Sequence, residues 1–251
     1  MSIAERKERE KELRRNSIID AAEGLFFSRG YDNVTMDDIA RAVELNKATI
    51  YIYFKNKDSL FFAVVLRGVR ILNGMVKESE KNADTGFKKL WGIGHSYLSF
   101  AKKYPDYNRV YNYFYSGRFD LENSTNFEDI IEGYFQGTGT RFWEIVSLAG
   151  HGNNEYLKEI IRLNYEIFSL IYNAIKSGVE DGHFRPELDI TESAVTFTLL
   201  IENIPKIRPD LRKVLDNGGI DQSRFSRYIG ESIGHMLIKK EHINTDLSMS
   251  I

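Results

Sequence analysis

Apolar residues recur along this chain at the spacing of helices rather than of strands. In the segment 57–80, for example, they fall mostly three or four residues apart: Leu60, Phe61, Val64, Val65, Gly68, Ile71 and Leu72. Beyond Leu60 the sequence has no regular apolar and polar alternation, and no linker rich in proline or serine. Such periodicity predicts amphipathic helices. We therefore expect an all-α fold, with further helices near residues 87–103, 105–116, 127–146, 155–178, 189–203 and 222–240.

Residues 35–54 predict two short helices joined by a tight turn. Thr35 can cap the first helix, and Asp38, three positions later, can reach back to the amide of Thr35, so the two form a capping box. Asn46 supplies the cap of the second helix, which begins at Lys47. This arrangement is typical of the helix-turn-helix, which places the amino end of its second helix in the major groove of DNA.

The order of motifs over the first quarter of the chain resembles the amino-terminal domain of the TetR family of transcriptional regulators. The segments that carry the resemblance are the apolar positions of 19–26, Arg29-Gly30-Tyr31, Val34-Thr35, Asp38-Ile39-Ala40, the run 47–54 and the run 55–60. The resemblance implies a helix-turn-helix DNA-binding domain of three helices at residues 1–56. It also implies a larger helical domain for effector binding and dimerisation at residues 57–245, in which the helix at 57–80 connects the two domains.

The same resemblance implies a function and a set of contacts. The family member it suggests is a cytoplasmic homodimer, usually a repressor, that leaves a near-palindromic operator when a small molecule binds. The predicted DNA-binding residues are Thr35, Asn46, Lys47, Ala48, Thr49, Tyr51, Tyr53 and Lys57. Three of them at the start of the second helix, 47–49, are placed for base edges, and Tyr53 and Lys57 for phosphates.

Several positions near the motif need separate interpretation. Tyr51 fits a base edge, a phosphate or packing on the first helix, whereas Ile50 and Phe54 are assigned to the core. Glu44 stands where the family usually has glycine in the turn, and Ala48 where it often has glycine in the recognition helix. We expect Glu44 to take a positive φ, which is uncommon outside glycine, asparagine and aspartate. Its negative charge also lies near the DNA side.

The net charge of the chain favours one mode of DNA binding over another. The net charge of -2 at pH 7 is unlike that of proteins that coat nucleic acid without sequence preference, whereas a site-specific dimer needs only a local basic surface. The segment 6–15 interleaves basic with acidic residues, as a solvated helix with charge pairs three and four residues apart does. Arg14 and Arg15 lie nearest its packed part and are placed to touch a phosphate or a minor groove.

The sequence offers no catalytic or metal-binding motif. It has no cysteine, which excludes disulfides, thiolate metal sites and a cysteine nucleophile. No histidine pair has metal-ligand spacing, and the glycine-rich segment 133–140 lacks the lysine of a P-loop. We expect no metal, no cofactor and no enzymatic activity. The first fifteen residues are charged and no apolar run of about 18 residues is evident, so we expect a soluble protein with no membrane partner.

The middle of the chain is rich in aromatic residues, most of which must fill a core. Tyrosines cluster where an apolar body and a polar tip are both useful, as at a cavity between helices. The predicted effector pocket consists of Trp91, Tyr97, Tyr111, Phe114, Trp143, Tyr165 and Phe168. It suits a flat or lipophilic molecule. A cationic molecule is a further alternative, because aromatic faces attract cations and Asp120, Glu122, Glu128 and Glu132 lie nearby in sequence.

The last two predicted helices carry apolar stripes. The family dimerises through its two final long helices, and the predicted interface consists of Phe197, Ile201, Phe225, Ile229, Gly230, Ile233, Gly234 and Leu237. The alternative is that the stripe of the final helix covers the core of its own protomer. Two function classes are thus in play: a ligand-responsive regulator, and an interaction protein that kept the helix-turn-helix but lost operator binding. The helix-turn-helix motif makes the first class the leading one, and only Glu44 and the acidic residues of the first helix favour the second.

Overall fold

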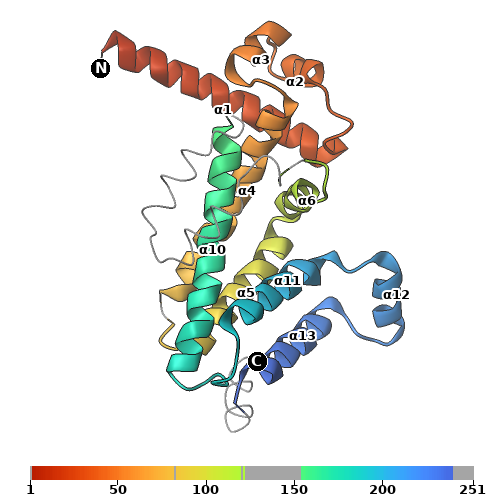
Figure 1. Cartoon of the computed structure of the whole chain (residues 1–251). Helices are drawn as coiled ribbons and strands as arrows, with labels where there is room; N and C mark the ends of the chain where they lie inside the picture. Colours follow the sequence, from red (N-terminus) through yellow and green to blue (C-terminus); the bar gives the residue numbers. More distant parts are fainter. Residues whose placement is uncertain (1, 82, 120, 122–153, 240–251) are drawn as a thin grey trace. The chain divides into compact units, whose positions relative to one another are not determined.

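The computed structural model of the chain describes residues 2–81, 83–119, 121 and 154–239 (Figure 1). The helices in chain order are α1 (Ile3–Arg29), α2 (Met36–Ala42), α3 (Lys47–Tyr53), α4 (Lys57–Glu80), α5 (Gly86–Lys103), α6 (Pro105–Phe114), α10 (Glu155–Glu180), α11 (Ile190–Asn203), the short 3-10 helix η1 (Ile204–Lys206), α12 (Pro209–Asn217) and α13 (Gln222–Leu237). These residues contain no β-strand, only one isolated bridge between Phe184 and Ile238. The predicted all-α fold is confirmed. The helix predicted at 127–146 lies outside the described residues.

The chain forms two compact units. Unit 1 comprises Met1–Arg70 and Pro105–Arg162, and unit 2 comprises Ile71–Tyr104 and Leu163–Ile251. The helices α4 and α10 each contribute residues to both units. The functional division into a DNA-binding domain at residues 1–56 and an effector domain at residues 57–245 stays a proposal.

The core of unit 1 joins the first three helices. Ile18, Ala22 and Phe26 line one side of α1, and they are completely buried together with Ile39 of α2 and Ile50 of α3. Burying a side chain of this size stabilises a fold by about 1.5–3 kcal/mol. The two short helices therefore depend on α1 for their stability, because seven residues are too few for an isolated helix.

An aromatic cluster extends this core towards α4 and α6. The ring of Phe61 lies 4.9 Å from that of Tyr31 and 5.4 Å from that of Phe119, measured between centroids. Phe62 meets Phe114 edge to face at 5.5 Å. Pairs of this geometry add about 0.5–1.5 kcal/mol each beyond their buried area. The cluster ties the loop after α1 to the first turns of α4 and to α6 within unit 1.

Two glycines in unit 2 bring α5 and α10 into backbone contact. A Cβ atom placed on Gly86 would lie 2.1 Å from the backbone nitrogen of Gly178 and 2.4 Å from the carbonyl oxygen of Ala174. The amide of Gly86 also donates to Asp181 Oδ2 at 2.8 Å. No side chain fits between the helices at this crossing, so glycine is required there by space.

The carboxy-terminal helices of unit 2 differ from prediction in two places. The structure contains α12, which was not predicted and whose residues are all at least partly exposed, so that it lacks a buried stripe. The last helix was predicted to reach residue 240 but ends at Leu237, because Ile238 turns into the bridge with Phe184.

The helix α4 is long and apolar enough to cross a membrane, by length and composition alone. Arg67 and Arg70 interrupt its apolar residues, so it is not an unbroken apolar run of about 18 residues, which the sequence predicts to be absent. In addition, 67 % of its most apolar window is buried inside the protein, as expected for the core helix of a globular fold.

Candidate nucleic-acid interface

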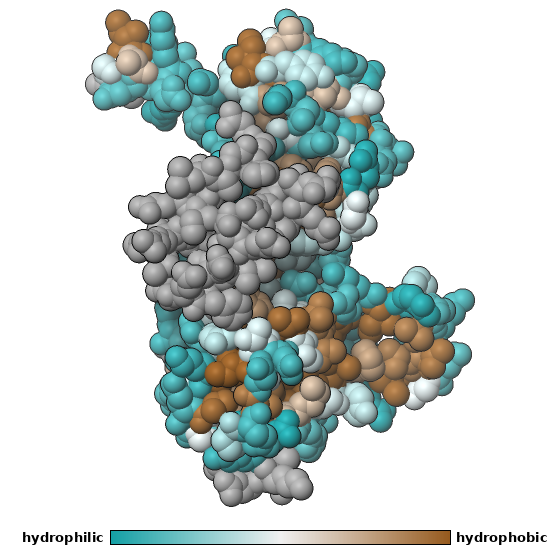
Figure 2. Space-filling view, viewed as in Figure 1, coloured by the Kyte–Doolittle hydropathy of each residue, from teal (hydrophilic) through white to brown (hydrophobic). Residues whose placement is uncertain are grey.

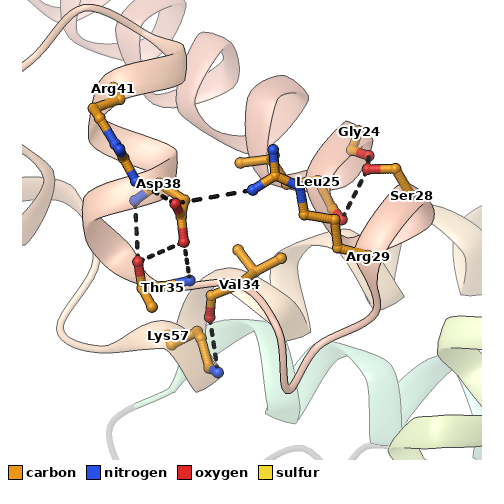
Figure 3. Close-up of polar contacts among 9 residues, drawn as sticks. All are labelled: Gly24, Leu25, Ser28, Arg29, Val34, Thr35, Asp38, Arg41 and Lys57. Atoms are coloured by element: carbon orange, nitrogen blue, oxygen red, sulfur yellow. Dashed lines mark hydrogen bonds and ion pairs between the residues drawn. The ribbon is translucent and has the colours of Figure 1, made fainter.

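The predicted capping box at the start of α2 is confirmed (Figure 3). The amide of Asp38 donates to Thr35 Oγ1 at 3.1 Å, and the amide of Thr35 donates to Asp38 Oδ2 at 2.9 Å. The hydrogen bonds from Thr35, with help from the neighbouring Arg41 at 2.5 Å, hold the pKa of the Asp38 carboxyl below its usual range. The second guanidinium shown beside Asp38, that of Arg29, lies 3.9 Å away. A negative carboxylate therefore fixes the first helix of the motif.

The turn between α2 and α3 is strained at one residue. Glu44 has a φ of 54°, in the left-handed region, as predicted from its place in a turn that usually holds glycine. The amide of Leu45 donates to the carbonyl of Ala40 at 2.9 Å and closes the turn. The turn thus forms with a non-glycine residue at a cost in backbone energy.

The second helix of the motif, α3, is capped by Asn46 and anchored by two apolar residues. Asn46 Oδ1 accepts from the amide of Thr49 at 2.7 Å and from its hydroxyl at 2.8 Å. Ile50 is fully buried and Phe54 is 1 % exposed, so their assignment to the core is confirmed. The buried face and the cap fix the orientation in which the remaining side chains of α3 face solvent.

The exposed side of α3 carries Lys47, Ala48, Tyr51 and Ile52. Lys47 Nζ forms an ion pair with Asp37 Oδ2 of α2 at 2.8 Å, which raises the pKa of this lysine. Tyr51 is 46 % exposed, and Ile52 is 74 % exposed. Ile52 was not among the predicted residues. Its sequence signal was its position four residues after Ala48, which places the two on one helix face.

Several predicted DNA contacts already have internal partners. The side chains of Thr35, Asn46 and Thr49 serve the two helix caps. Lys57 Nζ donates to the carbonyls of Tyr31 and Val34, both at 3.0 Å, and lies 4.0 Å from the centre of the Tyr31 ring. Since an ammonium has three N–H donors, Lys57 keeps one for another acceptor. The contact to Val34 is visible in Figure 3.

The hydroxyl of Tyr31 adds a second link to the start of α4. It donates to a carboxylate oxygen of Asp58. Burial and this hydrogen bond raise the pKa of Tyr31 well above its usual range, so the phenol stays protonated. Tyr53, the other residue predicted to hold a phosphate, is half-buried at the end of α3.

The two arginines predicted to lie near DNA differ in their surroundings. Arg14 is exposed on α1, whereas Arg15 bonds to the first residues of α10 through Tyr156 and Glu155. The Arg15 side chain is 29 % exposed. In unit 1 it is therefore a packing residue.

The predicted effector-pocket residues lie in separate surroundings. Trp91 lines a cavity of about 270 Å³ in unit 2, but the other predicted residues do not line it. In unit 1, Tyr111 and Phe114 of α6 are buried, and in unit 2 Tyr97 of α5 is buried. Tyr165 and Phe168 are half-buried on α10, and Trp143 lies outside the described residues. The prediction weighed aromatic content, whereas this cavity is lined largely by aliphatic residues and glycines from α5, α11 and α13.

The predicted dimer residues lie largely inside their own protomer. Five are buried within unit 2: Phe197, Ile201, Ile233, Gly234 and Leu237. The other three, Phe225, Ile229 and Gly230, are partly exposed. In the final helix, Ile233, Gly234 and Leu237 fit the alternative in which this stripe covers the protomer's own core, and the dimer interface stays a prediction. The outward apolar side chains on these helices are instead Val195, Leu199, Tyr228 and Met236.

Comparison with known proteins places the helix-turn-helix in a family. Residues 18–64 match the family model described as bacterial regulatory proteins, tetR family. Over 77 residues, 31% of this chain, the sequence is 32% identical to the biofilm operon icaADBC HTH-type negative transcriptional regulator IcaR of Staphylococcus aureus (strain Newman). That match spans 41% of IcaR, so the chain covers about two fifths of the length of this relative.

Solved structures extend the likeness of the fold over most of the chain. The ketosteroid transcriptional regulator KstR2 of Mycobacterium tuberculosis is similar at a TM-score of 0.57 and 14% identity, over 90% of this chain and 96% of that chain. A transcriptional regulator from Saccharomonospora viridis, in complex with choline, is similar at a TM-score of 0.61 and 17% identity, over 91% of this chain and 100% of that chain. Residues 18–64 therefore carry the helix-turn-helix of the TetR family of transcriptional regulators, within an all-α fold that is similar to those of solved transcriptional regulators.

Proposed function

We propose that the protein is a ligand-responsive transcriptional regulator that binds double-stranded DNA through α2 and α3. The observation that carries this proposal is the pair of capped helices with a buried inner face and an outer face exposing Lys47, Ala48 and Tyr51. A helix held in this way can enter a major groove without rearranging its own core. Repression is the proposed direction, by analogy with the relative IcaR, a negative regulator. Such an activity belongs in the cytoplasm, where the chromosome lies.

The proposed DNA contacts divide by chemistry. Lys47, Ala48 and Tyr51 reach base edges, joined by Ile52, whose apolar side chain suits the methyl group of thymine. Tyr53 and the remaining donor of Lys57 hold phosphates, and the internal bonds of Lys57 fix its position for that contact. Thr35, Asn46 and Thr49 set the geometry through their caps.

Selection of bound fragments from genomic DNA tests the proposal. The wild type is compared with the double variant Lys47→Ala, Tyr51→Ala, and with Lys213→Ala, which removes an exposed lysine of α12, as the control. We expect the wild type and the control to select an inverted repeat, with affinity that falls steeply as salt rises. The double variant should lose this selectivity. Equal, weak and sequence-independent retention of DNA by all three proteins would contradict the regulator proposal. It would favour an interaction protein that has lost operator binding.

A homodimer is part of the proposal, because two recognition helices related by a twofold axis match the two halves of a near-palindromic operator. Exposed apolar side chains on three consecutive helices support it: Val195 and Leu199 on α11, Leu211 and Val214 on α12, and Tyr228 and Met236 on α13. Figure 2 shows hydrophobic surface over these helices. A large exposed apolar patch usually marks a site of interaction with another protein.

The dimer is tested by sedimentation at a fixed protein concentration. Leu199→Asp places a charge in the proposed interface, and Leu13→Asp changes a leucine of similar exposure on α1, 61 % against 57 %. We expect the first variant to be monomeric and the second to behave as the wild type. A dimer that survives Leu199→Asp would remove α11 from the interface.

The effector is proposed to be a small lipophilic or aromatic molecule that releases the operator.

A further inference from the structure

A cavity in unit 2 lies among α5, α11, η1 and α13. Its volume of about 270 Å³ is close to the lower end, about 300 Å³, of the range found for small-molecule sites. Most of its wall is apolar, with Phe87, Trp91, Phe184, Phe197, Ile201 and Leu237 among the lining residues. Several of these side chains are otherwise buried, so the cavity is an indentation of the core of unit 2.

Glycines keep this space open between α5 and α13. A Cβ atom on Gly230 would lie 3.2 Å from the ring of Trp91, and one on Gly94 would lie 3.4 Å from Phe197 Cζ. Both glycines line the cavity. Side chains at these positions would occupy the volume that is now empty.

Three of the four polar lining residues gather towards one end of α13, and the fourth, His95, lies on α5. Ser223, Ser226 and Arg227 lie in the first two turns of the helix, before Gly230, whereas Ile233 and Leu237 follow it. At 1.5 Å per residue, Arg227 and Leu237 are separated by about 15 Å along the helix axis. Among the described residues that line the cavity, Arg227 carries the fixed charge and none is acidic. The cavity thus has a basic mouth and an apolar interior.

We propose that this cavity binds an amphipathic organic anion. Its acidic group lies against the Arg227 guanidinium and the hydroxyls of Ser223 and Ser226, and its apolar chain or ring lies against Trp91 and Phe197. An arginine beside two hydroxyls matches the donors that a carboxylate accepts. That ligand binding affects DNA binding rests on the proposed function, whereas the binding of the ligand to this cavity does not. Binding itself is measured without DNA.

Calorimetric titration with three ligands of equal chain length tests the assignment. The ligands are decanoate, decan-1-ol and decyltrimethylammonium, each below the concentration at which it forms micelles. We expect decanoate to bind one site per chain more tightly than the alcohol, and the cation to bind more weakly than both. With Arg227→Gln, decanoate should bind up to roughly fivefold more weakly, the upper end of the range for a solvent-exposed charge pair. The affinity of decan-1-ol should stay as in the wild type.

Two further variants separate the site from general effects. Arg224→Gln removes a neighbouring arginine of α13 that does not line the cavity, and it should leave decanoate binding unchanged. Gly94→Leu should abolish binding of both decanoate and the alcohol by filling the cavity, and Ile201→Phe provides a second filling variant if the first does not fold by circular dichroism. Equal affinity for decanoate and the cation, equal effects of the two arginine variants, or full binding by a folded filling variant would each overturn the proposal. An operator-binding failure would leave these outcomes unaffected.

Discussion

The side chain of Arg15 on α1 donates from Nε to the hydroxyl oxygen of Tyr156 on α10, at 2.6 Å. The guanidinium carbon also lies 5.1 Å from the centre of the Tyr156 ring and 5.9 Å from that of Phe54, the C-cap of α3. The rings of Tyr156 and Phe54 stack at 6.1 Å. One arginine therefore joins the first helix, the end of the recognition helix and the start of α10 within unit 1.

We expect Tyr156→Phe to destabilise the protein by about 1.5 kcal/mol, because it removes a hydrogen-bond partner of a charged group and keeps the ring. Urea unfolding followed by circular dichroism measures this change. Tyr51→Phe, which removes the hydroxyl of an exposed tyrosine, is the matched control and should have little effect. Equal midpoints for all three proteins would mean that the Arg15 contact does not stabilise unit 1.

The strain at Glu44 can be separated from its charge. We expect Glu44→Gly to stabilise the protein by about 1 kcal/mol, because glycine adopts a positive φ without a Cβ clash. Glu44→Gln keeps the Cβ atom and removes the charge, so it should leave stability near that of the wild type. Both variants should bind DNA more tightly at low salt if the carboxylate repels phosphate. Thermal unfolding and a DNA titration distinguish the two effects, and a destabilised glycine variant would contradict the strain.

The capping box predicts a pH dependence. Because the hydrogen bonds of Thr35 lower the pKa of folded Asp38, its stabilising contribution is complete above its unfolded pKa, about 3.9. The contribution is lost as pH falls through the lower folded value. The difference in thermal midpoint between the wild type and Asp38→Asn should therefore be largest near neutral pH and shrink in acid. Asp216→Asn, on exposed α12, is the control for loss of a surface carboxylate. A difference that grows in acid would contradict this sign.

The crossing of α5 and α10 predicts opposite effects for two glycine substitutions. We expect Gly86→Ala to destabilise the protein by at least about 1–3 kcal/mol, because its Cβ atom would meet the backbone of Gly178 at 2.1 Å. Gly74→Ala on α4 meets nothing within 4 Å and should stabilise by up to about 1 kcal/mol through helix propensity. Denaturant midpoints measure both. A neutral Gly86→Ala would show that the helices separate at little cost.

The features that could be predicted from the sequence are those set by residues close together in the chain. The capping box, the φ of Glu44 and the burial of Ile50 and Phe54 follow from spacing within one or two helical turns, and all are found. The helix α12 was missed although Leu211, Val214 and Leu215 recur at helical spacing, because nine residues are a short segment from which to recognise that period.

The cavity of unit 2 could not be predicted in the same way. It depends on Gly94 and Gly230, which lie far apart in the chain and mark a cavity only when α5 and α13 are placed together. Aromatic content drew the prediction towards Tyr111 and Phe114, which fill the core of unit 1 instead. Packing between distant segments decides which apolar residues enclose space and which exclude it.

The first residue of α4 has a consequence for how this regulator could respond to a signal. Lys57 donates hydrogen bonds to the carbonyls of Tyr31 and Val34, and the adjacent Asp58 accepts a hydrogen bond from the hydroxyl of Tyr31. These bonds tie the start of α4 to the segment that leads into α2. Under the proposed function, a signal that displaces the start of α4 also displaces the helix-turn-helix that follows this segment. In the proposed homodimer, the quantity that such a displacement changes is the spacing between the two helix-turn-helix domains.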